Sequence, residues 1–120
     1  MSNTTFQKIA GISTLICGTL HTTAHIVMSF LPSPNPEIQQ AMESVKINLI
    51  NEKTLFDYHN GMSLAMGFLV IGLAFQIFLL KTKPQLILNL FSTTAVAIIA
   101  IIYFHPVAMA LMLISALFLT

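Results

Sequence analysis

Residues 55–80, LFDYHNGMSLAMGFLVIGLAFQIFLL, decide the fold class of this protein. After Asp57 the stretch has no Asp, Glu, Lys or Arg side chain, and it is followed by Lys81, Lys83 and Pro84. A helix of about 20 consecutive apolar residues crosses the hydrocarbon core of a bilayer. The stretch therefore predicts a membrane-spanning helix that ends in a charged turn.

Three further apolar stretches lie at about residues 9–31, 85–103 and 106–120. The first ends at a run of prolines, which cannot continue a helix, and we expect it to be a span rather than a cleaved signal sequence. The last is short, although Pro106 suits the first turn of a helix. The chain is thus predicted to be an all-α membrane protein, with residues 1–120 forming one up-down four-transmembrane-helix bundle.

The composition agrees with a lipid environment. Hydrophobic residues make up 56% of the 120 residues and charged residues only 8%, whereas soluble domains contain roughly 25% charged residues. A soluble chain this small could not bury so much apolar surface. The five basic residues are all lysines and are scattered, so we expect no nucleic acid partner. The one cysteine, Cys17, excludes an intramolecular disulfide.

The lysines predict the orientation of the spans. Lys8 precedes the first span, and Lys81 and Lys83 lie between the second and third, so all three fall on one side. Positive loops prefer the cytoplasm. We therefore expect a bacterial cytoplasmic (inner) membrane protein with both termini in the cytoplasm and the loop 32–54 outside.

The outer loop contains a helical pattern. Ile38, Met42, Val45 and Leu49 recur at steps of three and four, which predicts an amphipathic helix over residues 36–50. It would lie on the membrane surface or cap the bundle. An ordinary loop helix packed on its neighbours explains the pattern equally well.

Small and polar residues mark the expected contact face of each span, because helices in lipid associate by close packing and interhelical hydrogen bonds. These faces contain Gly11, Thr14, Gly18, His21 and His25; Asn60, Ser63, Gly67 and Ala74; Asn89, Thr93, Val96, Ala100 and Tyr103; and His105, Ala108, Met112 and Ser115.

All four histidines lie in the predicted spans or at their ends, on the expected outer side. Ionisable groups in spans are costly and mark functional sites. The ligand-binding candidates are His21, His25, Asp57 and His59, and the candidates for a metal site are His21, His25, His59 and His105.

Three interpretations of these residues remain open. His21 and His25, spaced i and i+4, could face one metal ion or haem, completed by other members of the set. Alternatively, His21 or His25 could act with Asp57 in proton transfer at a quinone or lipid site, which would make the protein an enzyme. In the third interpretation Asp57 caps a helix, His21 and His25 hydrogen-bond across helices, and His59 and His105 lie half hydrated at the membrane interface.

The methionines invite a copper site, but they are scattered along the chain. We interpret Met62, Met66, Met109 and Met112 as packing residues.

Several short motifs resemble a family of small bacterial four-helix membrane proteins whose reaction is not characterised. They are Gly18-Thr19-Leu20-His21, Met42-Glu43-Ser44, Phe56-Asp57-Tyr58 with Gly61, and Tyr103-Phe104 with Pro106. The resemblance implies four spans and singles out His21, Asp57 and Gly61. We therefore expect an accessory or ligand-binding subunit of a membrane complex, associated with other membrane subunits or with itself.

Overall fold

The computed structural model describes residues 4–48, 52–102 and 106–119. The predicted helical class is confirmed for these residues, and a short hairpin is added to it. Of the four long helices, α1 differs most from expectation, because it begins at Thr4 rather than near residue 9. The elements are α1 (Thr4–Ser29), α2 (Pro36–Ser44), β1 (Lys46–Asn48), β2 (Glu52–Thr54), α3 (Leu55–Phe78), α4 (Lys83–Ile102) and α5 (Pro106–Leu119).

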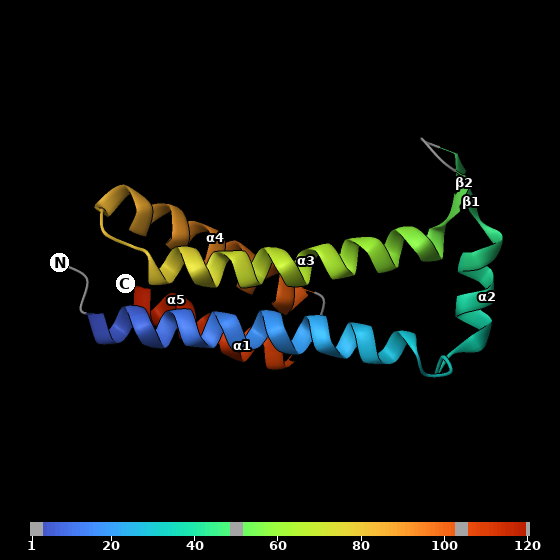
Figure 1. Cartoon of the computed structure of the whole chain (residues 1–120), viewed down its shortest axis with the longest axis horizontal. Coiled ribbons are helices and arrows are strands. Elements are labelled where there is room, and N and C mark those ends of the chain that lie inside the picture. Colours follow the sequence, from blue (N-terminus) through green and yellow to red (C-terminus); the bar gives the residue numbers. More distant parts are fainter. Residues whose placement is uncertain (1–3, 49–51, 103–105, 120) are drawn as a thin grey trace.

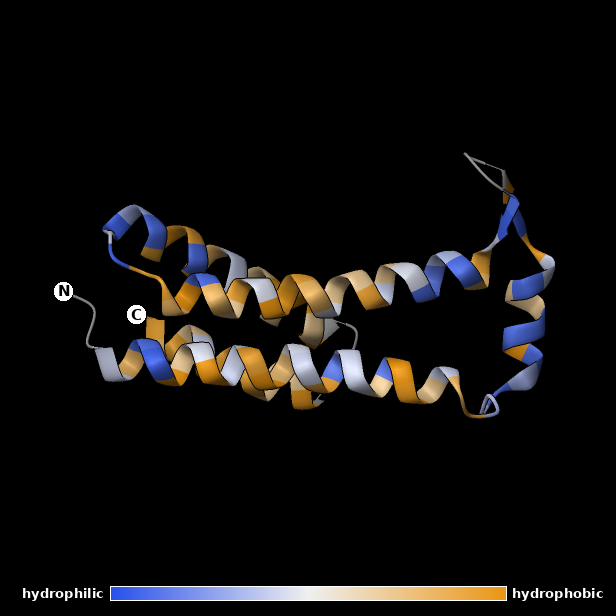
Figure 2. Cartoon of the chain, viewed as in Figure 1, coloured by the Kyte–Doolittle hydropathy of each residue, from blue (hydrophilic) through white to orange (hydrophobic). Residues whose placement is uncertain are grey.

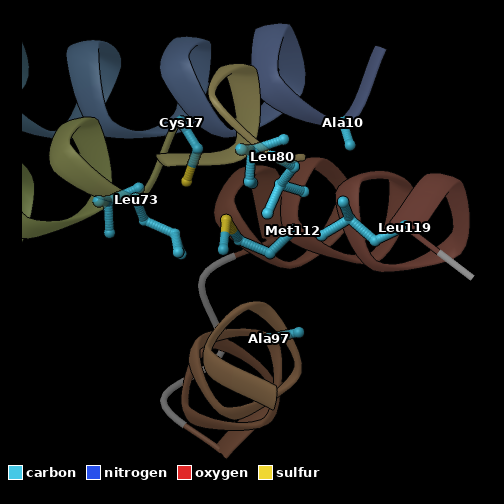
Figure 3. Close-up of a cluster of buried hydrophobic side chains, with 9 residues drawn as sticks. Ala10, Cys17, Leu73, Leu80, Ala97, Met112 and Leu119 are labelled. Carbon is cyan, nitrogen blue, oxygen red and sulfur yellow. The ribbon is translucent and has the colours of Figure 1, made fainter. Parts of the chain in front are cut away.

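The helices α1 and α3 form a long antiparallel pair, and α2 lies across one end of it (Figure 1). At the other end α5 packs along α1, and α4 packs mainly on α5 rather than on α3. The hydrophobic core lies in this half, where Cys17 of α1, Leu73 of α3 and Met112 of α5 are buried (Figure 3). The opposite halves of α1 and α3 extend beyond α4 and α5 (Figure 1).

Glycines set the distance between α1 and α3. A Cβ atom added at Gly18 would lie 2.8 Å from the backbone nitrogen of Ile71 and 3.1 Å from the carbonyl oxygen of Gly67. A Cβ atom added at Gly67 would collide with the hydroxyl of Thr22. Small residues allow backbones to approach this closely. The prediction that these glycines face the neighbouring helix is confirmed.

Hydroxyl groups join α1 to α5. The Oγ1 atom of Thr14 lies 2.7 Å from the Oγ atom of Ser115, and Ser13 donates to the carbonyl oxygen of Leu111. Most of the predicted contact faces are buried in the same way. The buried members are Gly11, Thr14, Gly18, Gly67, Ala74, Asn89, Thr93, Ala100, Met112 and Ser115. Tyr103 and His105 lie outside the described residues.

The predicted helix over 36–50 is too long, because α2 ends at Ser44. Val45 is extended, and β1 pairs antiparallel with β2, with Lys46 opposite Thr54 and Ile47 opposite Lys53. Val45 and Ile47 are β-branched and favour extended backbone, and the pairing with β2 ends the helix despite the helical spacing of the apolar residues. Leu49, the last member of the predicted stripe, lies outside the described residues.

Polar side chains close the end of the bundle opposite α2. The Nε2 atom of Gln7 donates to the carbonyl oxygens of Ile77, Phe78 and Leu80, at 2.7, 3.1 and 3.2 Å. These hydrogen bonds from Gln7 satisfy carbonyl groups that a helix end leaves unpaired. They also bring the start of α1 to the turn between α3 and α4, so Lys8, Lys81 and Lys83 gather at one end, as expected.

Two helices of the described residues are long and apolar enough to cross a membrane, at Leu55–Phe78 and Lys83–Ile101. Helix α1 has sufficient length at 26 residues, but Ser, Thr and His residues lower its hydropathy. Helix α5 is apolar but has only 14 residues. Figure 2 shows apolar residues concentrated in the long helices, and hydrophilic residues at α2, the hairpin and the start of α4.

Candidate functional site

His21 is the candidate residue that the structure ties most firmly to a second helix. Its Nε2 atom lies 3.0 Å from the carbonyl oxygen of Ser63 and 3.2 Å from the Oγ atom of Ser63. Since a carbonyl oxygen only accepts, the contact at 3.0 Å requires a proton on Nε2. In the neutral imidazole with this tautomer, the lone pair lies on the Nδ1 atom.

Beside His21, the α1–α3 contact holds an unpaired polar group. The Oγ1 atom of Thr22 is buried and has no hydrogen-bond partner among the described residues. It lies against Gly67, whose missing side chain leaves room for it. An unpaired buried hydroxyl is unfavourable, so this position favours a bound water molecule or a ligand group that hydrogen-bonds to it.

His25 lies one turn further along α1 and is half-buried. Because Gly18 contacts Ile71 and His21 contacts Ser63, the antiparallel register places His25 near the level of Met62 on α3. His21 and His25 are neighbours on one face of α1, as their i, i+4 spacing predicts.

Asp57 serves as a helix cap. Its Oδ2 atom accepts from the backbone nitrogen of Thr54 at 3.0 Å and from the Thr54 hydroxyl at 2.9 Å, while the Thr54 Oγ1 atom accepts from the Asp57 nitrogen. This reciprocal arrangement is a capping box, which satisfies exposed N–H groups at a helix start. The predicted capping role of Asp57 is confirmed, and its carboxylate is oriented toward Thr54 rather than toward a histidine.

The other two histidines stay apart from that contact. His59 is exposed on the first turns of α3, and His105 lies outside the described residues. Among the residues that the structure describes, no hydrogen bond or ion pair joins any two of His21, His25, Asp57 and His59. No group of three or more His, Cys, Asp or Glu side chains in the same residues could hold a metal ion.

Residues that sequence reasoning had assigned to packing lie close to the histidines. Met62 and Met66 have exposed fractions of 69% and 39%, so neither fills the core, whereas Met112 is fully buried as predicted. The signal that could have identified them is their spacing of three and seven residues from His59, which places all three on one face of α3.

The groups that the structure offers in this region are donors of electron pairs. Imidazole nitrogens, hydroxyls and thioether sulfurs are available in the half of the α1–α3 pair that α4 and α5 leave uncovered (Figure 1). The only carboxylate predicted to take part, that of Asp57, is engaged at the helix cap. No protein-family model matches the chain, and no curated protein or solved structure matches it either.

Proposed function

We propose that the protein is a small integral membrane protein that acts as a non-catalytic accessory and ligand-binding subunit of a membrane complex. The proposal that the protein lies in a membrane rests on the exposure of large apolar side chains on all four long helices. Examples are Leu20 of α1 at 52%, Leu69 of α3 at 67%, Phe91 of α4 at 73% and Leu117 of α5 at 71%. Water does not favour such a continuous apolar surface, and lipid does.

Helix lengths support a proposal of four embedded helices with one incomplete span. At 1.5 Å per residue, α1, α3 and α4 are about 39, 36 and 30 Å long, against a hydrocarbon core of about 30 Å. Helix α5 is only about 21 Å long. In this proposal α5 stops part of the way across the bilayer and packs on the first half of α1.

The proposed orientation places both termini in the cytoplasm of a bacterial cell, with α2 and the hairpin outside. Lys8, Lys81 and Lys83 support it because they gather at the end where α1 begins. We also propose, from the short motifs, that the chain is related to the small bacterial four-helix membrane proteins that it resembles.

Labelling of single cysteines tests the orientation. In a Cys17→Ala background, we expect a membrane-impermeant maleimide to label Glu43→Cys in intact cells, and Lys81→Cys only after permeabilisation. Both positions are exposed, so access to the reagent depends on the side of the membrane. The reverse labelling pattern, or recovery of the protein in the soluble fraction, would refute the proposal.

The accessory role is supported by the half of the α1–α3 pair that α4 and α5 leave uncovered (Figure 1). We expect the chain, tagged and expressed at its natural level, to co-purify in a mild detergent with a larger membrane assembly. A strong detergent that separates subunits is the control. Repeated isolation of the chain alone in the mild detergent would contradict the accessory role.

A further inference from the structure

One side of the α1–α3 pair changes its residue types halfway along its length, from small and apolar residues to His and Met. On each helix, residues spaced three or four positions apart form a stripe along this side. On α1 the stripe contains Ala10, Thr14 and Cys17, and then His21, His25 and Met28; on α3, followed from its C-terminal end, it contains Ile77, Leu73 and Val70, and then Met66, Met62 and His59.

The first half of each stripe belongs to the buried interior. Cys17, Val70 and Leu73 are at most 8% exposed, and Ala10 and Ile77 are fully buried in the same core. The second half is largely uncovered: Met28 is 50% exposed and Met62 69%, while His25 alone is half-buried. Residues at helical spacing share a face, so the second half continues the face that packs on the rest of the bundle.

The length of α5 explains why this face becomes uncovered. The ring centroids of Phe6 and Phe118 lie 5.4 Å apart, and Thr14 bonds to Ser115, so α5 runs antiparallel to α1. The same register, together with the Ser13–Leu111 hydrogen bond, brings the start of α5, at Pro106, to about the level of Leu20. Figure 1 shows the remainder of α1 and α3 extending past it.

The two exposed half-stripes lie on the same side of the α1–α3 pair. The contacts of Gly18 with Ile71 and of His21 with Ser63 fix the register between the helices. This register places three residues of α1 opposite three residues of α3. Both stripes lie on the side of the pair on which α5 packs nearer the start of α1. The pairs are His21 with Met66, His25 with Met62, and Met28 with His59.

The composition of this face is selective. The whole chain has four histidines and seven methionines among 120 residues, yet all six positions of the two exposed half-stripes are His or Met. Thioether sulfur and imidazole nitrogen are soft and intermediate donors that suit Cu(I), whereas Mg²⁺ and Ca²⁺ require oxygen ligands. None of the six positions supplies a carboxylate.

The orientation of His21 agrees with a metal ligand. A ligating histidine usually donates its second ring N–H to a carbonyl or carboxylate group, which fixes the ring. The Nε2 atom of His21 makes this bond to the carbonyl oxygen of Ser63 at 3.0 Å, so its Nδ1 atom is the one that can bind an ion.

We propose that this side of the α1–α3 pair, the His/Met face formed by these six residues, binds a Cu(I) ion between α1 and α3. His21 and Met66, with His25 and Met62 one turn further out, supply the ligands, and Met28 and His59 form an outer pair through which the ion enters. The inference names the ligand of the accessory protein proposed above and rests on that function. The binding itself is a property of the folded chain alone.

The test is a titration of the purified full chain in detergent, without a nickel column and without oxygen, with Cu(I) and a chromophoric Cu(I) chelator as competitor. We expect one equivalent to bind, and Met62→Leu with Met66→Leu to weaken the affinity at least tenfold. Leu conserves the volume and the helix preference of Met. Met109→Leu on α5 is the matched control and should leave the affinity unchanged.

Copper-edge X-ray absorption on the loaded protein provides a second measurement. We expect both sulfur and nitrogen neighbours in the wild-type chain, and fewer sulfur neighbours in the double Leu variant. The proposal fails if the wild-type chain binds no equivalent, as it would if lipid or a second copy of the chain covers the His/Met face. It also fails if the double variant and Met109→Leu have equal affinity. Neither result depends on co-purification, so the accessory role is tested separately.

Discussion

The contact between α1 and α3 at Gly18 gives a prediction whose size follows from the structure. In Gly18→Ala, the new Cβ atom meets the nitrogen of Ile71 and the oxygen of Gly67, and neither backbone atom can rotate away. Ordinary contact begins at 3.4 Å, and the shortest distance is 2.8 Å, so the helices must separate by about 0.6 Å.

A separation of this size has a definite energetic cost. A gap of about 0.5–1 Å forfeits a quarter to a half of the dispersion attraction between facing atoms. Overpacking substitutions typically cost about 1–3 kcal/mol, and the better helix preference of Ala offsets up to about 1 kcal/mol. We therefore expect the free energy of unfolding of Gly18→Ala to fall by about 1–2 kcal/mol.

The assay is reversible unfolding in mixed micelles, followed by circular dichroism. Gly72→Ala is the matched control because it lies in α3, and a Cβ atom added there meets no atom within 4 Å. It should leave the free energy of unfolding unchanged or raise it by up to about 1 kcal/mol. Equal stability of the two variants would show that Gly18 does not set the helix distance.

Two further predictions concern polar contacts. The substitutions Thr14→Val and Ser115→Ala, made singly and together, should reveal a coupling of about 0.5–1.5 kcal/mol in the free energy of unfolding, because the two hydroxyls are buried and lie 2.7 Å apart; additive effects would contradict this bond. Thr54→Ala should lower the free energy of unfolding by about 1 kcal/mol, because it removes the side chain that caps α3. Hydrogen exchange should then accelerate in the first turn of α3 and stay constant in its last turn, and unchanged protection in the first turn would argue against the cap.

The sequence predicted the long helices and most of their contact faces for physical reasons that act locally. Apolar runs bounded by Pro32 and by Lys81 specify where helices end. Glycine and hydroxyl residues at helical spacing specify which face meets a neighbour, as Gly18, Gly67 and Thr14 show. These features require no knowledge of the partner helix.

Other features depended on contacts with another element of the fold and could not be predicted. The spacing of Ile38, Met42 and Val45 is helical, yet α2 ends at Ser44 because the following residues pair with β2. Similarly, Met62 and Met112 have the same side chain, but one is exposed and the other buried. The difference arises because α5, which contains Met112, packs on α1 and α4, whereas the first half of α3, which contains Met62, extends beyond them.

The short length of α5 therefore has a direct consequence for the candidate site. If α5 were two turns longer, it would cover His21 and Met66, and apolar residues would suffice at these positions. If α5 merely ended early, lipid would fill the space, and the apolar stripe of Val70 and Leu73 would be expected to continue along α3. Instead the stripe changes to Met66, Met62 and His59 where the cover ends. A histidine facing lipid is unfavourable, so its presence there, beside thioethers and opposite His25, favours an occupant that binds nitrogen and sulfur.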